Sequence, residues 1–237
     1  MSNLFALVTG GTKGLGKSII YALSEKGYNV AFCSRSLQDG IDLKSNLEME
    51  FPKLKFYFKK CDVTSKTEID EFLTALFKDF NNKIDILVNN AGVFLPGNVL
   101  DEEDSQLPFQ IETNLYSAYY FTKPIAKGMI ANKAGHIFNM CSVASLKAYP
   151  NGGSYSISKF ALHGFSKVLR EELKPHNVKV TSIFPGATWS DSWKGVDLPR
   201  ERLMEPEDIA KLVVCSLDLS PAATLEDIIV RPQLGDL

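Results

Sequence analysis

Short apolar runs rich in β-branched residues alternate with stretches of helical periodicity along the whole chain. The predicted strands are Leu4–Thr9, Asn29–Ser34, Leu54–Lys60, Ile84–Asn89, His136–Cys141, Val178–Phe184 and Asp227–Arg231. The predicted helices are about Leu15–Lys26, Gln38–Phe51, Lys66–Phe80, Asp104–Asn132, Ser154–Lys174 and Glu205–Leu219. Near-continuous apolar strands separated by helices are typical of a parallel sheet that is covered on both faces.

This order of elements predicts the fold class. Parallel strands joined by right-handed crossovers, with a switch point after the first strand, form an α/β sheet of the Rossmann type. We therefore expect a doubly wound, parallel, seven-stranded sheet with helices on both faces. The 237 residues contain no linker and no repeat, so they suit a single nucleotide-binding domain, 1–237, with a short substrate lid at about 187–205.

A glycine-rich loop lies between the first predicted strand and the first predicted helix, at positions 9–16. Glycine permits a tight turn and a close approach of the backbone to a pyrophosphate, and the following helix N-terminus offers unpaired N–H groups. A plain turn between strand and helix is the alternative, but the place after the first strand favours a cofactor site. The predicted cofactor-binding residues of this loop are Gly10, Thr12, Lys13, Gly14, Leu15 and Gly16.

The end of the second predicted strand selects between NAD and NADP. Sheets that bind NAD place an Asp or Glu there for the ribose hydroxyls, whereas this chain has Ser34, Arg35 and Ser36. Arg35 and Lys13 can bind a 2′-phosphate, and each charge-assisted contact contributes about 1.5–3 kcal/mol. NADP(H) is therefore the predicted cofactor.

The end of the third predicted strand carries Asp62 and Val63. Asp62 is a candidate acceptor for the adenine amino group, so both residues are predicted to line the adenine site. A helix N-cap at Thr64 or Ser65 explains the polar residues there equally well.

A proton-transfer site is predicted from Tyr155 and Lys159, together with Ser142 thirteen residues before the tyrosine and Asn114 further upstream. One helical turn separates Tyr155 from Lys159, so their side chains share a face. A second Tyr-x-x-x-Lys pair, at 119–123, has a glutamine in place of the upstream serine and follows no strand. These four side chains are of the types that reduce a carbonyl or oxidise an alcohol.

Composition excludes several functions. The net charge of −2 argues against a dedicated nucleic-acid binder. No apolar run approaches the ~20 residues of a membrane span, and the first residues lack the basic leader of a signal peptide. We therefore expect no nucleic-acid partner, no membrane association and a cytoplasmic location.

The cysteines and histidines predict neither disulfides nor a metal site. The four cysteines, at 33, 61, 141 and 215, are widely spaced, which indicates buried thiols in a reducing compartment. The three histidines, at 136, 163 and 176, form no ligand pattern, so no metal is expected.

Taken in order, these motifs resemble the short-chain dehydrogenase/reductase family in its classical form, over nearly the whole chain. The matching segments are the glycine loop at 9–16, Asp62, the Asn-Asn-Ala-Gly run at 89–92, the tetrad of Asn114, Ser142, Tyr155 and Lys159, and Pro185-Gly186 with Thr188. The basic pair of Lys13 and Arg35 is similar to that of the family's NADP-dependent branch.

The resemblance implies a role for each residue. Tyr155 is the general acid, Lys159 lowers its pKa and holds the nicotinamide ribose, Ser142 polarises the substrate oxygen, and Asn114 supports a proton-carrying water. The small residues Asn90, Ala91 and Gly92 leave room for the cofactor over the sheet edge. The nicotinamide is walled by Pro185, Gly186, Ala187 and Thr188.

The substrate pocket is less constrained. Trp189 and Trp193 both fall in the predicted lid, which suggests an apolar or flat substrate, although either could instead anchor the loop. The other candidate pocket residues are apolar: Phe94, Leu95, Val143, Leu146, Tyr149 and Phe184. Lys147 and Lys194 are the candidates for binding an anionic group.

We therefore expect an NADPH-dependent oxidoreductase that reduces a ketone or aldehyde by hydride transfer, acting on a small-molecule carbonyl or alcohol. Reduction of 3-oxoacyl thioesters, of pterin side chains and of general carbonyl compounds all remain open. The short lid and the C-terminal tail are similar to the carbonyl-reductase and sepiapterin-reductase branches. A non-catalytic NADP(H) sensor is the alternative from another class, and the length leaves no separate domain for a sugar epimerase.

A homodimer is expected, with a homotetramer as the alternative. The predicted helices at 104–132 and 154–174 carry apolar side chains at Tyr116, Tyr119, Tyr120, Phe160, Leu162 and Phe165. In the family the equivalent helices pair across a two-fold axis, whereas packing against the sheet explains about half of these side chains. The family's glycine-rich last strand is replaced here by Glu226–Pro232, which disfavours the usual tetramer.

Overall fold

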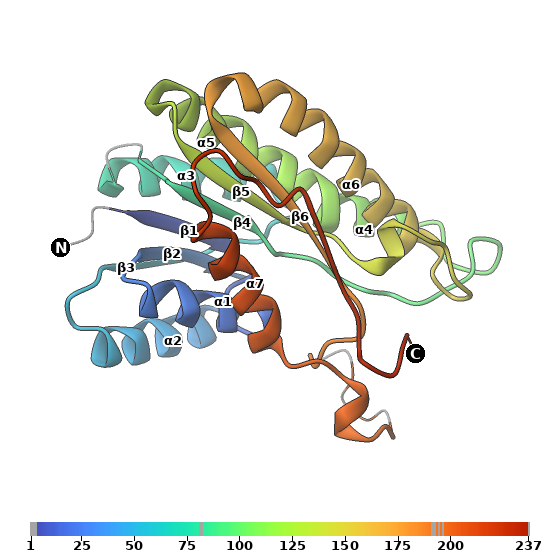
Figure 1. Ribbon diagram of the computed structural model, residues 1–237. Coiled ribbons are helices and arrows are strands. Elements are labelled where there is room, and N and C mark those ends of the chain that lie inside the picture. Colours follow the sequence, from blue (N-terminus) through green and yellow to red (C-terminus); the bar gives the residue numbers. More distant parts are fainter. Residues whose placement is uncertain (1–3, 81–82, 191–192, 194, 196, 237) are drawn as a thin grey trace.

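The computed structural model describes residues 4–80, 83–190, 193, 195 and 197–236. One sheet runs through it, with seven parallel strands in the order β3-β2-β1-β4-β5-β6-β7. The strands are β1 (Phe5–Thr9), β2 (Asn29–Ser34), β3 (Phe56–Lys60), β4 (Ile86–Asn89), β5 (Gly135–Met140), β6 (Val178–Pro185) and β7 (Asp227–Val230). The order reverses between β1 and β4, so the switch point lies where the sequence predicted it (Figure 1).

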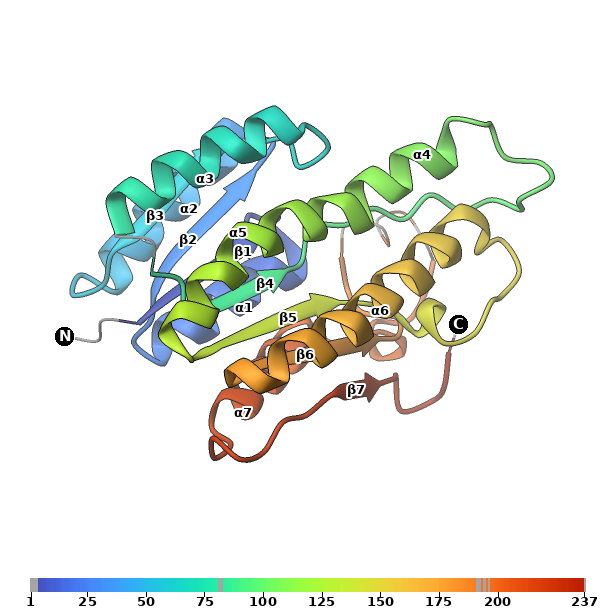
Figure 2. The same ribbon diagram turned by 90° about the horizontal axis from the view of Figure 1, so that it is seen from above.

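Helices cover both faces of this sheet (Figures 1 and 2). One layer contains α1 (Gly14–Glu25), α2 (Leu37–Glu50) and α7 (Pro206–Leu217). The other contains α3 (Lys66–Phe80), α4 (Gln106–Ile111), α5 (Ser117–Asn132) and α6 (Gly153–Leu173). The predicted seven-stranded, doubly wound fold is confirmed.

Burial on both faces explains why the strands are apolar at nearly every position. All six residues of β2 are buried. Ala31 and Cys33 pack in the core beneath α3 and α5, whereas Val30 and Phe32 pack in the core beneath α1 and α2. Because successive side chains of a strand point to opposite faces, β2 contributes side chains to both cores.

The predicted helix at 104–132 is helical from Gln106 to Asn132, but it is not a regular α-helix throughout. A π-helical segment, Glu112–Tyr116, joins α4 to α5 and contains the buried Asn114. The i→i+5 pattern of such segments is frequent at functional sites and is not encoded by apolar periodicity.

The cysteines follow the prediction in three cases of four. Cys33, Cys61 and Cys141 are buried free thiols, whereas Cys215 on α7 is exposed. No helix within the described part of the chain is long and apolar enough to cross a membrane.

Candidate active site

The glycine loop between β1 and α1 has the backbone geometry of a phosphate cradle. Gly10 and Gly14 have φ angles of +64° and +49°, which disfavour side chains. A Cβ atom on Gly16 would lie 2.3 Å from the carbonyl oxygen of Gly10. No side chain caps the N-terminus of α1, so its backbone N–H groups are available to a phosphate. The loop therefore fits a dinucleotide.

Asn90 locks this loop to the end of β4. Its Nδ2 atom donates to the carbonyl oxygens of Thr9 (2.9 Å) and Gly10 (3.0 Å). In return the Thr9 hydroxyl oxygen accepts from the backbone N–H groups of Asn90 (3.1 Å) and Ala91 (3.0 Å). The sequence predicted Asn90 as a cofactor contact, but it did not indicate this role of joining the two strands at the switch point.

The predicted 2′-phosphate site lies where the loop meets the end of β2. The backbone N–H of Gly11 donates to the carbonyl of Cys33 (3.1 Å), which holds the loop beside that strand. Arg35 is exposed and has no hydrogen bond or ion pair among the residues that the structure describes. Its guanidinium is therefore available to an anion.

The serines and Lys13 are less available than the sequence suggested. The Ser36 hydroxyl caps α2 by accepting from the N–H of Asp39 (3.2 Å), and the Ser34 hydroxyl donates to the carbonyl of Ser36 (2.9 Å). Lys13 forms an ion pair with Asp39 at 3.2 Å. Sequence reasoning missed Asp39, although an acid in the first turn of a helix beside a predicted phosphate site was a visible signal.

Asp62 adopts a local turn geometry, and Ser65 is the helix N-cap that was the alternative explanation of the polar residues there. Its Oδ1 atom accepts from the backbone N–H (3.0 Å) and the hydroxyl (2.8 Å) of Thr64. The Ser65 hydroxyl accepts from the N–H of Glu68 (3.3 Å) at the start of α3, while Val63 is buried in the core. Local geometry therefore explains these residues, and adenine binding by Asp62 and Val63 stays a prediction.

Tyr155 and Lys159 lie one turn apart on α6, as their spacing predicted. Lys159 is only 5% exposed. Its Nζ atom donates to the carbonyl oxygen of Met140 (2.8 Å) and lies 5.8 Å from the centroid of the Tyr155 ring. A Cβ atom on Gly92 would lie 3.4 Å from that Nζ atom and 3.2 Å from Oδ1 of Asn114. The glycine thus leaves open the space in front of the ammonium.

Burial dominates the ionisation of both groups. It raises the pKa of Tyr155 to about 12, against a smaller lowering by the hydrogen bond from Ser142. It also lowers the pKa of Lys159 to about 8. The expectation that Lys159 lowers the pKa of Tyr155 is therefore wrong for this structure. The reason is that the ammonium bonds to the carbonyl of Met140, while desolvation has the largest effect on the phenol.

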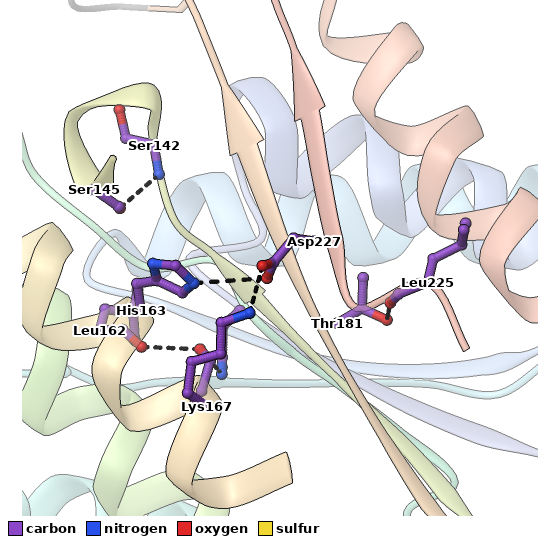
Figure 3. A network of polar contacts seen from close by, with 10 residues as sticks. Ser142, Ser145, Leu162, His163, Lys167, Thr181, Leu225 and Asp227 are labelled. Atoms are coloured by element: carbon purple, nitrogen blue, oxygen red, sulfur yellow. Dashed lines mark hydrogen bonds and ion pairs between the residues drawn. The ribbon is translucent and has the colours of Figure 1, made fainter. Parts of the chain in front are cut away.

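The Ser142 side chain caps a short helix, and its predicted role towards the substrate oxygen stays a prediction. Its hydroxyl oxygen accepts from the N–H of Ala144 (3.1 Å), and its own N–H donates to the Ser145 hydroxyl (3.1 Å, Figure 3). This capping box starts the short 3₁₀ helix Val143–Ser145. The same side chain also lowers the pKa of Tyr155, against the larger effect of burial. The cap fixes the serine beside the phenol.

Asn114 is 1% exposed, and its amide is held by protein groups on both sides. Its Oδ1 atom accepts from the N–H of Val93 (2.7 Å), and Nδ2 donates to the carbonyl of Val93 (3.0 Å) and to the hydroxyl of Ser158 (2.8 Å). Ser158 in turn donates to the carbonyl of Tyr155 (2.7 Å). Asn114 thus joins the π-helical segment to the tyrosine's own turn, and its support of a water remains a prediction.

The segment at the end of β6 contains the residues predicted to wall the nicotinamide, and that role stays a prediction. The N–H of Gly186 donates to the carbonyl of Val230 (2.8 Å), and the Thr188 hydroxyl donates to the carbonyl of Gly186 (3.0 Å). A Cβ atom on Gly186 would lie 3.0 Å from Cδ of Pro232. The C-terminal segment after β7 therefore packs behind this wall, a contact that the sequence did not indicate.

The predicted lid is partly described. Trp189 anchors it: the Arg200 guanidinium lies 4.4 Å from the ring centroid, and the N–H of Trp189 donates to the carbonyl of Met204 (2.9 Å). Arg200 also pairs with Glu205 at the start of α7. Lys194 lies outside the described residues.

Three of the predicted pocket residues are partly exposed, and we call them the apolar rim: Phe94, which contacts Tyr155, with Leu146 and Tyr149. The Phe94 ring meets the Tyr155 ring edge-on at 4.9 Å between centroids. Leu146 and Tyr149 are 36% and 40% exposed. Phe184 does not belong to this rim, because it is fully buried and packs edge-on against His163 at 4.8 Å.

A polar network joins helix α6 to the last strand of the sheet (Figure 3). Lys167 pairs with Asp227 of β7, and Nε2 of His163 lies 3.6 Å from the same carboxylate. Arg170 pairs with Glu226. These contacts hold the helix that carries Tyr155 and Lys159 against the last strand.

Comparison with known proteins identifies the family. The model of the family described as short chain dehydrogenase matches residues 4–200. The chain is 29% identical over 227 residues to an uncharacterised oxidoreductase of Staphylococcus epidermidis, covering 96% of both chains.

Solved structures are similar over the whole length. An alcohol dehydrogenase from the archaeon Thermococcus sibiricus, complexed with 5-hydroxy-NADP, superimposes with a TM-score of 0.89 at 25% identity, covering 97% of both chains. A metagenomic short-chain oxidoreductase in complex with NADP superimposes with a TM-score of 0.85 at 28% identity, covering 98% of both chains.

Proposed function

The chain belongs to the short-chain dehydrogenase family of oxidoreductases, and from that premise we propose that it is an NADPH-dependent reductase of ketones or aldehydes. The observation that carries the proposal is the assembly of Tyr155, Lys159, Ser142 and Asn114 at the carboxyl edge of the sheet, beside a cradle that fits a dinucleotide. An NADP(H) sensor without activity would not require this complete set.

NADP(H) is the proposed cofactor. The glycine loop at 10–16 would hold the pyrophosphate, and Arg35 with Lys13 would bind the 2′-phosphate. Two similar structures hold NADP or a derivative of it, which supports the same choice here. When bound, the cofactor supplies the hydride in reduction and accepts it in oxidation.

The chain's own residues supply the proton and the orientation. Tyr155 would donate its phenolic proton to the carbonyl oxygen of the substrate. Ser142, fixed by its capping box, would donate a second hydrogen bond to that oxygen and polarise it. Lys159, with a pKa lowered to about 8, is poised to exchange a proton near neutral pH.

The carbonyl compound is proposed to present an apolar group. Phe94 contacts the Tyr155 ring, and with the partly exposed Leu146 and Tyr149 it would form an apolar rim of the pocket. The segment 187–205, anchored by Trp189 and Arg200, would act as the substrate lid. General carbonyl reduction fits this rim better than reduction of 3-oxoacyl thioesters. Among the described residues, no hydrogen bond joins a lysine or arginine to the Ser142 side chain, where an anionic carrier would need a cation.

A homodimer is the proposed assembly. Of the six apolar side chains that the sequence singled out, Tyr116, Tyr119 and Phe160 are 45%, 39% and 45% exposed, whereas Leu162 is buried. Ile157 and Val168 on α6 are also exposed, at 42% and 58%. These side chains form an apolar strip along α5 and α6.

The test is the rate of NADPH consumption, with NADH in parallel, over diketones, aromatic aldehydes, quinones, acetoacetyl thioesters and sepiapterin. Turnover of one class with NADPH is the expected result. Tight NADPH binding without turnover of any class would contradict a reductase and favour the sensor.

A further inference from the structure

A second buried amide lies one turn before Asn114 and contacts the same loop. Gln110 of α4 is fully buried. Its Oε1 atom accepts from the N–H of Leu95 (3.2 Å), and its Nε2 atom donates to the carbonyl of Leu95 (3.4 Å). Asn114 makes the equivalent pair of contacts to Val93. Two side-chain amides thus satisfy the backbone of alternate residues, as a neighbouring strand would.

Phe94 lies between these two anchored residues, so its backbone position is fixed from both sides. Its ring meets the ring of Tyr155 at 75° with 4.9 Å between centroids. The ring is 37% exposed, so one part covers the phenol and another part faces the space beside it. Edge-on aromatic pairs of this kind contribute about 0.5–1.5 kcal/mol beyond the area that they bury.

The next part of the loop is tied to the start of α6. The N–H of Gly97 donates to the carbonyl of Asn151 (3.0 Å), and the N–H of Asn151 donates to Oδ1 of Asn98 (3.2 Å). Glu102 accepts from the N–H of Ser154 (3.3 Å). The segment 93–102 therefore bridges α4 and α6 directly over the tyrosine.

We propose that Gln110 is a positioning residue, which holds Leu95 and thereby sets Phe94 as the wall that selects the substrate. The selected compounds are carbonyl compounds that place a planar apolar group against the exposed part of the Phe94 ring. This inference rests on the proposed reductase for its choice of substrate, but not for the contact between Gln110 and Leu95.

The contact is tested without any substrate. Amide hydrogen exchange at Leu95 is measured in Gln110→Met, which keeps the side-chain length but removes both hydrogen bonds. The control is Gln106→Met on the same helix, because the Oε1 atom of Gln106 accepts no hydrogen bond within the described residues. We expect exchange at Leu95 to accelerate at least about 10-fold in Gln110→Met only. Unchanged exchange would overturn the positioning role.

Selection is tested with a matched pair of methyl aryl and methyl alkyl ketones. In Gln110→Met and in Phe94→Leu, the ratio of the kcat/KM values for aryl and alkyl ketone should fall about 3- to 10-fold, mainly through KM. In the double variant this ratio should be no lower than in the single variants, since Gln110 acts through Phe94. Equal losses on both ketones, or additive losses in the double variant, would contradict the proposal.

Two outcomes separate this inference from the proposed function. If the wild type turns over no ketone or aldehyde, the reductase is wrong, and the exchange at Leu95 alone decides the positioning role. If Gln110→Met does not fold, Phe94→Leu still tests selection, because that side chain is partly exposed.

Discussion

The Nζ atom of Lys159 donates a 2.8 Å hydrogen bond to the carbonyl oxygen of Met140, the last residue of β5. This bond ties the helix that carries Tyr155 to the edge of the sheet. The ammonium is almost fully enclosed, and the loss of hydration lowers the pKa of Lys159 to about 8. The protonation of this lysine should therefore be measurable as a pH dependence of the protein's stability.

Lys159→Met should remove a pH dependence of stability. Between about pH 8 and 10.5 the unfolded chain binds a proton on Lys159 that the folded chain does not. The free energy of unfolding of the wild type therefore rises with pH across this window. Urea unfolding from about pH 7.5 to 10 should show the wild type gaining stability relative to the variant. Lys127→Met, at an exposed position, is the control. A stability difference between the wild type and Lys159→Met that stays constant over this pH range would contradict burial of the charge.

Tyr155→Phe should abolish turnover and leave NADPH binding intact. The phenolic proton is lost, whereas the ring still packs against Phe94, so kcat should fall by about 10²–10⁴. The matched control is Tyr119→Phe, whose hydroxyl accepts from Lys123 at 3.3 Å in the second Tyr-x-x-x-Lys pair. Equal activity in the two variants would exclude Tyr155 as the acid.

Arg35→Asp should weaken NADPH relative to NADH by about 10- to 100-fold, since it replaces a charge-assisted contact with repulsion. Asp39→Asn should have the opposite effect, because it releases Lys13 from its 3.2 Å ion pair towards the phosphate. Fluorescence titration of both cofactors gives the dissociation constants. An unchanged ratio in Arg35→Asp would show that this residue does not bind the 2′-phosphate.

Gly16→Ala should prevent cofactor binding. The added Cβ atom would lie 2.3 Å from the carbonyl oxygen of Gly10, so the loop must shift. In Gly164→Ala on α6 the new atom meets nothing within 4 Å. That control should bind NADPH normally and be more stable by up to about 1 kcal/mol, through helix propensity. Normal binding by Gly16→Ala in calorimetry would contradict the cradle.

Phe160→Glu should convert a dimer into a monomer. Phe160 on α6 is 45% exposed, and a carboxylate there would be buried in a paired helix face. Met49→Glu on α2, at a position 73% exposed, is the control outside that face. Size-exclusion chromatography with light scattering measures the mass, and a monomeric wild type would refute the dimer.

The sequence allowed the fold to be predicted almost element by element. Strands buried on both faces must be apolar at nearly every position, so β2 and β6 were visible as runs. The i, i+4 spacing of Tyr155 and Lys159 required only that α6 be a helix. The π-helical segment at Asn114 was missed, because it leaves no periodic signal.

Tertiary structure decided how the site residues are used. The amide of Asn114 reaches Ser158, 44 residues away, and that of Asn90 reaches Thr9, 81 residues away. No local pattern specifies such pairs, since they form only when the strand order brings distant segments to one edge of the sheet. The same applies to Phe184, which the sequence placed in the pocket and the structure buries against His163.

The pKa values of the site residues show the same difference between what the sequence and the tertiary structure determine. Residue types and spacing determined that this chain is a dinucleotide-binding α/β protein with a tyrosine–lysine pair. Burial in the folded chain is the largest reason that the pKa of Tyr155 rises to about 12 and that of Lys159 falls to about 8. The physical reason is that desolvation depends on every atom packed around a group, and the folded chain sets that packing from all parts of the sequence at once.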